Sequence, residues 1–210
     1  MDNVFLVRHP LVQHHLCCLR DEKTDSSEFR QSLRRLSILL AYEATQNLEL
    51  EAVEVRTPLA PAKAMILRER IGLVPILRAG LGMVEPILDL IPDAEVWHLG
   101  FYRDEKTLKP VEYYKKLPPG GAVDIALVLD PMLATGGSAL AALEAIRSWG
   151  VRRIKLLAMI AAPEGIHAVR ESYPETEIFV CAVDSHLNGH GFIVPGLGDA
   201  GDRAFNARAK

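Results

Sequence analysis

The chain has 210 residues, of which 49% are hydrophobic and 24% are charged, a balance typical of one globular domain and not of a disordered chain. The formal net charge is −3, so the basic excess of a typical nucleic-acid-binding protein is absent and no nucleic-acid partner is expected. No uncharged apolar run approaches the roughly 18 to 20 residues needed to cross a bilayer, so no membrane partner is expected either.

The cysteines and the N-terminus predict a cellular compartment. Cys17, Cys18 and Cys181 are odd in number and contain no CxxC pair, which favours reduced thiols over a disulfide framework. The segment Met1–Pro10 lacks the basic stretch and apolar core of a secretory leader. We therefore expect a cytoplasmic protein.

The predicted elements begin with two helices and then alternate between strands and helices. A short helix is expected at Pro10–Asp21, and a longer one starts at Asp25–Glu28, where Asp or Ser can cap it, and ends near Asn47. Apolar residues of the long helix recur every three or four positions, which gives it one buried face. The following elements are then expected: strand Ala52–Val55, helix Ala60–Arg70, strand Leu73–Leu77, helix Gly82–Ile91, strand Val96–Tyr102, strand Ile125–Leu129, helix Ser138–Trp149, strand Ile154–Ile160, helix His167–Tyr173 and strand Ile178–Ala182.

This alternation predicts an α/β fold, a mainly parallel sheet flanked by helices, in a single domain over residues 1–210. The strand at Ile125–Leu129 is wholly apolar, as expected for a strand buried on both faces. Two segments depart from the pattern. Arg103–Gly121 is polar and predicts a long loop or protruding hairpin, whereas Asp184–Lys210 is rich in Gly, His and Asp and predicts a small, irregular C-terminal cap.

The most informative segment follows the apolar strand Ile125–Leu129. An acid, Asp130, leads into a short loop that opens the next helix; the loop residues are Pro131, Met132, Leu133, Ala134, Thr135, Gly136, Gly137 and Ser138. The glycines let main-chain N–H groups approach an anion, the hydroxyls add donors, and a helix N-terminus favours a phosphate. A plain strand-to-helix turn is the alternative; the GxxxxGK[ST] loop of many ATP- and GTP-binding proteins is absent.

Two further segments contain glycines beside charged residues. Arg78 precedes Gly80 and Gly82 after a predicted strand, and its guanidinium suits a pair of phosphate oxygens. A dinucleotide-binding fingerprint is disfavoured, because Glu85 stands where its third glycine belongs. The tail Gly191–Arg203 is the second glycine-rich segment, and a surface turn is the alternative interpretation there.

Together these segments resemble the type I phosphoribosyltransferases. Asp130–Ser138 is similar to their motif for phosphoribosyl pyrophosphate (PRPP), and Pro131, where most members have a second acid, resembles the uracil-specific branch. Arg78 and its glycines are similar to the pyrophosphate loop, and Phe101–Glu105 resembles the flexible loop whose arginine, here Arg103, contacts PRPP. The tail Gly191–Arg203 is also similar. The resemblance extends in order from Arg30 to Arg203.

The resemblance to uracil phosphoribosyltransferases implies an activity and a set of site residues. The reaction converts uracil and PRPP to UMP and diphosphate in pyrimidine salvage, with Mg²⁺ held mainly by PRPP oxygens and water and with no direct protein ligand assigned. The implied catalytic residues are Asp199, Asp130 and Arg78. The implied PRPP-binding residues are Arg78, Arg103, Asp130, Pro131, Met132, Leu133, Ala134, Thr135, Gly136, Gly137, Ser138 and Asp199.

The same resemblance places uracil against the main chain of the tail. Uracil presents an acceptor, a donor and an acceptor in order, which a carbonyl flanked by N–H groups can recognise, while a cytosine edge would leave a buried group unpaired. The implied uracil-binding residues are Ile193, Gly198, Asp199 and Ala200.

Family resemblance also implies partners, and three rival functions stay open. Members are commonly homo-oligomers and some are activated by GTP, although the sequence reveals no GTP site. The rivals are a phosphoribosyltransferase for another base, an RNA-binding regulator of pyrimidine genes, and an inactive nucleotide sensor. The metal-capable side chains between His14 and Cys18 have no second cluster to complete a site, so no protein metal site is expected.

Overall fold

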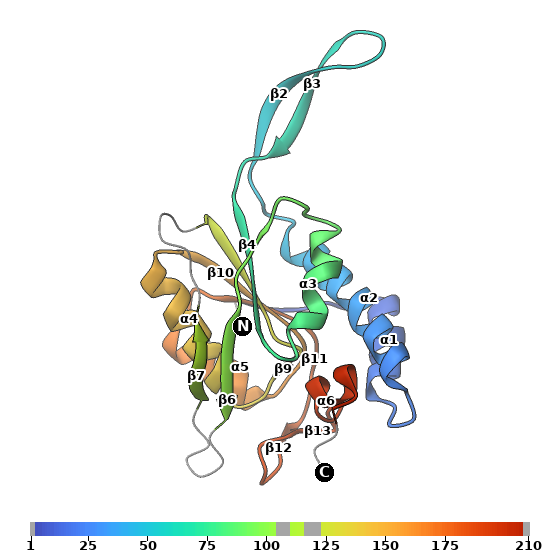
Figure 1. The fold of residues 1–210 in the computed structure, drawn as a ribbon, viewed down its shortest axis with the longest axis vertical. Coiled ribbons are helices and arrows are strands. Elements are labelled where there is room, and N and C mark those ends of the chain that lie inside the picture. The colour runs from blue at the N-terminus through green and yellow to red at the C-terminus, as the bar shows by residue number, and fades with distance from the viewer. Residues whose placement is uncertain (1–2, 104–109, 116–122, 208–210) are drawn as a thin grey trace.

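The computed structural model describes residues 3–103, 110–115 and 123–207 (Figure 1). The strands of its main sheet are β1 (Val4–Leu6), β4 (Ile71–Leu77), β5 (Glu95–Val96), β6 (Leu99–Arg103), β7 (Pro110–Lys115), β8 (Ile125–Leu129), β9 (Met132–Leu133), β10 (Arg153–Ala161) and β11 (Glu177–Val183). Their order is β1-β11-β10-β8-β4-β6-β7, with β5 on β4 and β9 on β10. Every pairing is parallel except β6 with β7. The predicted α/β fold with a mainly parallel sheet is confirmed.

Helices cover both faces of this sheet (Figure 1). On one side lie α1 (Pro10–Arg20), α2 (Ser26–Ala44) and α3 (Leu81–Leu88), and on the other lie α4 (Gly137–Trp149) and α5 (Pro163–Ser172). Strand β8 is apolar throughout because both of its faces are buried. Its alternate side chains belong to different cores: Ile125, Leu127 and Leu129 pack toward α1–α3, and Ala126 and Val128 pack toward α4.

The long helix α2 forms where the sequence predicts it. Asp25 caps it, because its carboxylate accepts the main-chain N–H groups of Ser27 and Glu28, each at 2.8 Å. Its apolar face is fully buried, and the same face contacts α1 and α3. Helix α2 therefore forms the support on which the C-terminal part of the chain rests.

The helix predicted at Ala60–Arg70 is wrong. These residues form β3 (Pro61–Leu67), which pairs antiparallel with β2 (Leu50–Arg56) in a hairpin that projects from the body (Figure 1). Ala, Lys, Met and Leu favour a helix locally, but pairing with β2 overrides that propensity. The turn between the strands is closed by Thr57, whose hydroxyl oxygen accepts the N–H groups of Leu59 and Ala60.

The segment after the predicted strand Val96–Tyr102 pairs as a hairpin, one of the two predicted alternatives, and the C-terminal cap has more regular structure than predicted. The single strand expected at Val96–Tyr102 is divided into β5 and β6, and β6 pairs with β7 within Arg103–Gly121; residues 104–109 and 116–122 lie outside the described part. The C-terminal cap contains β12 (His186–Leu187), β13 (Ile193–Val194) and α6 (Ala200–Phe205). Among the described helices, none combines the length and apolar character needed to cross a membrane.

Candidate active site

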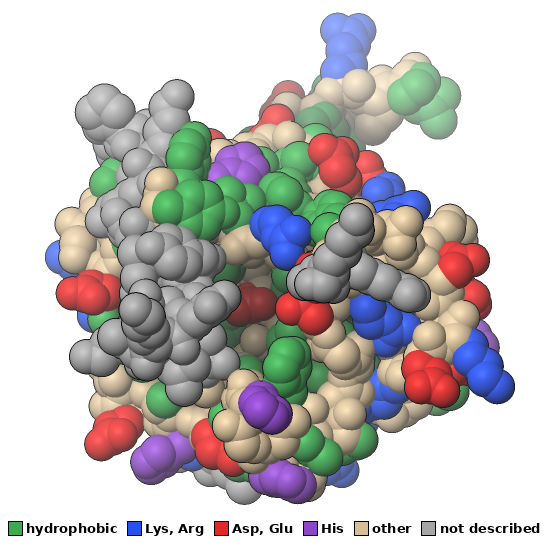
Figure 2. Space-filling view, turned by 60° about the horizontal axis from the view of Figure 1, so that its bottom comes forward, with side chains coloured by type: hydrophobic (Ala, Val, Ile, Leu, Met, Phe, Trp, Pro, Cys, Tyr) green, Lys and Arg blue, Asp and Glu red, His purple; other side chains and the backbone are tan. Residues whose placement is uncertain are grey.

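A cavity of about 510 Å³ opens at the carboxyl ends of β4 and β8. Its walls come from the end of β4, the loop between β8 and α4, a side chain of β7 and the C-terminal cap. This edge is where open α/β sheets bind ligands, because loops from neighbouring parallel strands converge there. Figure 2 shows this face, with an acidic side chain deep in a hollow and basic and apolar side chains around it.

The loop between β8 and α4 is tightly built. Gly136 has a φ of 85°, a left-handed conformation that glycine adopts without a steric penalty. A Cβ on Gly165, in the first turn of α5, would lie 2.4 Å from the carbonyl oxygen of Ala134. The loop thus lies directly on α5, and its last residues, Gly136, Gly137 and Ser138, line the cavity. Thr135 stabilises the curve, because its Oγ1 accepts the N–H of Gly137 at 3.4 Å.

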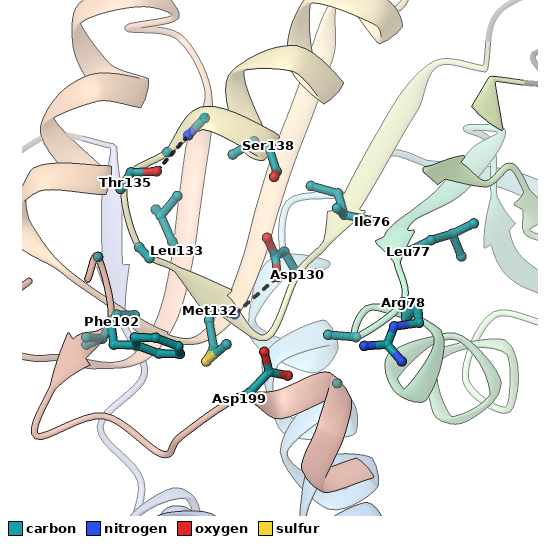
Figure 3. A pocket seen from close by; sticks show the side chains of 18 of the residues that line it. Ile76, Leu77, Arg78, Asp130, Met132, Leu133, Thr135, Ser138, Phe192 and Asp199 are labelled. Carbon is teal, nitrogen blue, oxygen red and sulfur yellow. Dashed lines mark hydrogen bonds between the residues drawn. The ribbon is translucent and has the colours of Figure 1, made fainter. Parts of the chain in front are cut away.

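Asp130 occupies the start of this loop and lies in the interior of the cavity (Figure 3). Its carboxylate accepts the main-chain N–H of Met132 at 3.3 Å. Burial raises the pKa of Asp130 to about 7, and the hydrogen bond from Met132 opposes that rise. Near neutral pH the carboxyl therefore exchanges between ionised and protonated forms, and hydroxyl groups that donate to it would favour the ionised form.

The loop after β4 brings a cation to the opposite side of the cavity. Arg78 donates to the carboxylate of Asp202 at 3.0 Å, while its side chain is 57% exposed and accessible to a ligand. Gly80 lets this loop pass close to β8, because a Cβ there would lie 2.3 Å from the carbonyl oxygen of Leu129. Figure 3 shows Arg78 and Thr135 on opposite sides, with Asp130 and Asp199 between them.

The C-terminal cap supplies the last wall. Asp199 caps α6, since its Oδ1 accepts the main-chain N–H of Asp202 at 2.8 Å. Gly196 and Gly198, with φ values of 70° and 77°, form the turn that leads from β13 to this cap. Within the described residues, the main-chain N–H groups of Gly198 and Ala200 have no hydrogen-bond acceptor. The turn therefore offers main-chain donors beside a carboxylate.

The order of these features in the chain can be compared with known families. The sequence model of the uracil phosphoribosyltransferase family matches residues 6–207. The chain belongs to this family. The match covers the chain segments that contain the phosphate loop, the arginine loop and the C-terminal tail.

Individual relatives agree with the family. The uracil phosphoribosyltransferase of Roseiflexus sp. (strain RS-1) is 60% identical over 98% of this chain and 99% of its own length. That of Thermoanaerobacter sp. (strain X514) is 54% identical over 98% of this chain and 99% of its own length. The resemblance to the uracil-specific branch therefore covers nearly the whole chain.

Solved structures support the fold. The AQ2163 protein from Aquifex aeolicus superposes with a TM-score of 0.93 at 41% identity, over 99% of this chain and 100% of that chain. The adenine phosphoribosyltransferase from Leishmania donovani superposes with a TM-score of 0.60 at 13% identity, over 88% and 85% of the two chains. The second similarity supports the fold alone.

Most site residues expected of a uracil phosphoribosyltransferase line the cavity. They are Arg78, Asp130, Met132, Leu133, Ala134, Thr135, Gly136, Gly137, Ser138, Ile193 and Asp199. Pro131 does not line it; its carbonyl oxygen instead accepts the N–H groups of Met159 and Ile160 in β10. Gly198 and Ala200 are next to Asp199 without lining the wall, and the side chain of Arg103 lies outside the described part of the chain.

The cavity wall also contains residues that were not predicted as site residues, among them Tyr113, Phe192 and Gly201. The ring of Phe192 is 48% exposed and adjoins Ile193, so its place in the tail motif was the available signal. Gly201 lies between two charged groups: a Cβ there would come within 3.3 Å of an Asp199 oxygen and 3.9 Å of an Arg78 nitrogen. No sequence pattern predicts the inward position of Tyr113, which depends on pairing at the sheet edge.

Proposed function

We propose that this cavity binds PRPP and uracil together and forms UMP and diphosphate. The chain is an enzyme of the pentosyltransferase class, as its family membership indicates. One observation carries the assignment of the site: a glycine-rich anion loop, an arginine and the C-terminal cap line a single cavity, and the unpaired main-chain donors of the cap flank Asp199 in its wall. These groups match the three parts of the reactants, which are a phosphomonoester, a diphosphate and a base.

The 5′-phosphate occupies the loop Thr135–Ser138 in this proposal. The main-chain N–H groups at the start of α4, the hydroxyls of Thr135 and Ser138 and the positive end of the helix dipole all favour an anion there. Support comes from the left-handed Gly136, which turns the main chain around the cavity. Asp130, at the start of the loop, accepts hydrogen bonds from the ribose hydroxyls.

Diphosphate is the leaving group, and we assign it to the arginine side of the cavity. Arg78 donates charge-assisted hydrogen bonds to its oxygens, and Arg103 is proposed as a second contact. Asp199 lies near Asp130, between the sides of the cavity that carry Arg78 and Thr135 (Figure 3), and is proposed to face C1′, which would develop positive charge as its bond to diphosphate breaks. Uracil N1 then bonds to C1′, and its proton passes to the departing diphosphate or to water. The protein contributes mainly positioning and electrostatic stabilisation.

Mg²⁺ is proposed as the metal that accompanies PRPP. The cavity fits this metal, because Asp130 and Asp199 both line it and carry the carboxylate oxygens that Mg²⁺ prefers. PRPP and water would complete the coordination shell of the metal. Within the described residues, no group of three or more His, Cys, Asp and Glu side chains gathers around a point. When bound, the metal would neutralise charge on the leaving diphosphate.

Uracil is proposed to lie against the turn Ile193–Ala200. The unpaired N–H groups of Gly198 and Ala200 are the donors that its two carbonyl oxygens require, and a main-chain carbonyl accepts its N3–H. Ile193 supplies an apolar wall, which is buried at 7% exposure. Cytosine would place a donor against a donor, so discrimination against it is expected.

We also propose a homo-oligomer, with GTP as an effector. The hairpin β2–β3 supports the oligomer, since Leu59, Met65 and Ile66 on it are 96%, 57% and 45% exposed. An isolated two-stranded hairpin is marginally stable in water, so a second copy covering it would stabilise both. Light scattering measures the oligomer, and initial rates with and without GTP measure the effector.

The deciding experiment is an assay of UMP formation from uracil, PRPP and Mg²⁺, with cytosine, hypoxanthine and orotate in parallel. Activity with uracil alone is expected. Activity with another base would leave the PRPP site in place and refute the assignment of the base to Ile193–Ala200. Inactivity with every base, without and with GTP, would favour a non-catalytic regulator.

A further inference from the structure

The turn that is proposed to bind uracil is held by an ion pair from distant parts of the chain. Its centre is Gly196, which is buried and has a left-handed backbone conformation. A Cβ added at this position would lie 2.2 Å from the carbonyl oxygen of Ile193. Glycine is required here for both reasons. Such a tight turn has one conformation only if its polar main-chain atoms are paired.

Asp184 and Arg20 pair both of these atoms. The Oδ2 of Asp184 accepts the N–H of Gly196 at 2.8 Å, and Nη1 of Arg20 donates to the carbonyl oxygen of Gly196 at 2.8 Å. The two side chains also form a bidentate pair with each other, at 2.8 and 2.5 Å. The side chain of Asp184 is only 4% exposed, so water screens this pair weakly.

Rigid elements support both partners. Arg20 is the last residue of α1, whose other face is buried through Val12, Leu16 and Leu19. Asp184 follows β11, and its main-chain N–H donates to the carbonyl oxygen of Ala161 at 2.8 Å. Gly196 is therefore held by residues anchored in the helix layer and in the sheet, which are more rigid supports than a surface loop.

Arg203 fixes the residue after Gly196 in the same way. It donates to the carbonyl oxygen of Leu197 at 2.7 Å and to those of Leu19 and Asp21, at the end of the same helix α1. Both polar main-chain atoms of Gly196 and the carbonyl oxygen of Leu197 are thus paired, whereas the N–H groups of Gly198 and Ala200 are without acceptors among the described residues. The fixed atoms immediately precede the atoms that are open to a ligand.

We propose that Arg20 and Asp184 are positioning residues that determine the affinity and selectivity for uracil by fixing Gly196. The inference rests on the proposed function of the turn. Neither side chain lines the cavity, so each acts through the main chain of the turn. Uracil is small and is recognised by few hydrogen bonds, so a small displacement of Gly198 and Ala200 weakens all of them together. The phosphates of PRPP are assigned to Thr135–Ser138 and Arg78, which lie outside this turn, so PRPP binding depends less on its position than uracil binding does.

The test compares two conservative variants with a matched control. Arg20→Lys retains the positive charge but loses the planar fork that contacts Asp184 and Gly196 together. Asp184→Asn retains the size of the side chain, but its NH₂ group would face an N–H of Arg20 or Gly196 that now donates to the carboxylate. The control is Arg70→Lys, which changes an exposed ion pair with Glu95 at 2.6 Å. UMP formation is measured while uracil and PRPP are varied in turn, and thermal unfolding is followed with and without PRPP.

For both variants we expect KM for uracil to rise about tenfold, as loss of roughly one good hydrogen bond would give, with KM for PRPP changed less than twofold. The ratio of kcat/KM for uracil to that for cytosine should fall by a similar factor. The PRPP-dependent rise in the unfolding temperature should persist, which shows that the variants fold. Arg70→Lys should leave both KM values unchanged.

Three results would overturn the proposal: an unchanged KM for uracil, an equal rise of both KM values, or a fall in kcat alone. The last two are the signs of a general structural role. Measuring the unsubstituted protein distinguishes failure of this proposal from failure of the proposed function. If the parent forms no UMP from uracil, the proposed function fails; if the parent is active and the variants match it, only the positioning role fails.

Discussion

Replacing Asp130 by Asn should make the stability of the protein less dependent on pH. Burial raises the pKa of this carboxyl from 3.8 to about 7, so the folded chain holds its proton more tightly than the unfolded chain does. Between these two pH values the folded state binds more protons. The contribution of Asp130 to stability is therefore complete below pH 3.8 and is lost as pH rises to about 7. Asparagine is neutral throughout and loses nothing.

The size of the effect follows from the shift. A difference of about three pKa units corresponds to about 4 kcal/mol between the acidic and neutral limits. The cavity is open to water and relaxation of the site reduces this limit, so we expect Asp130→Asn to gain roughly 2 kcal/mol over the parent between pH 4 and pH 8. With ribose hydroxyls donating to the ionised carboxylate, as proposed, KM for PRPP should also fall in the parent as pH rises through 7, and should fall less in the variant.

Urea unfolding of the parent and of Asp130→Asn at pH 4, 5, 6, 7 and 8, without ligands, measures the difference. Thr135→Ser is the control, because it changes the same loop without changing a titrating group. A stability difference between parent and Asp130→Asn that is constant with pH would refute the reasoning. So would a gain for the variant that is largest at pH 4.

Other residues give sharper tests of single roles. Asp199→Ala should lower kcat by roughly 10²–10³-fold and cost ~1 kcal/mol of stability through loss of the α6 cap, whereas Asp199→Asn should keep the cap and still lose activity; near-normal turnover of either would exclude the charge-stabilising role. Gly136→Ala places a side chain at a φ of 85° and 3.1 Å from the Cβ of Ala168, so a loss of about 1–2 kcal/mol and a higher KM for PRPP are expected in denaturation and rate measurements. Lys155→Met removes the buried hydrogen bond from Nζ to the carbonyl oxygen of Ala44 at 2.6 Å, at the end of β10 remote from the cavity, so stability should fall by about 1–3 kcal/mol with both KM values unchanged.

The sequence by itself determined the elements whose signals are local. The bounds of β8 coincide with the predicted strand Ile125–Leu129, because a run of apolar residues between polar turns has few alternatives to a buried strand. Helix α4 begins at Gly137, one residue before the predicted start, because small residues and hydroxyls mark a helix entry. The phosphate loop and Arg78 were predicted for the same reason: each directly follows a strand.

Where local signals conflict with pairing partners, the sequence was insufficient. The segment Ala60–Arg70 consists largely of helix formers, and only its antiparallel register with β2 makes Pro61–Leu67 a strand. Tyr113 reaches the cavity through the pairing of β6 with β7, which no local pattern specifies. In both cases the deciding hydrogen bonds join residues that the sequence does not place side by side.

Only the tertiary structure determined which residues hold the site in place and how the pKa of its buried carboxyl is shifted. Arg20 is 164 residues from Asp184 and 176 from Gly196 in the chain, and they meet because the parallel sheet brings the end of β11 beside the end of α1. The raised pKa of Asp130 likewise comes from burial, which depends on the surrounding walls. A sequence records which side chains are available and how they favour local structure. Their distances, screening and partners across the chain arise only when the sheet and its two helix layers close around them.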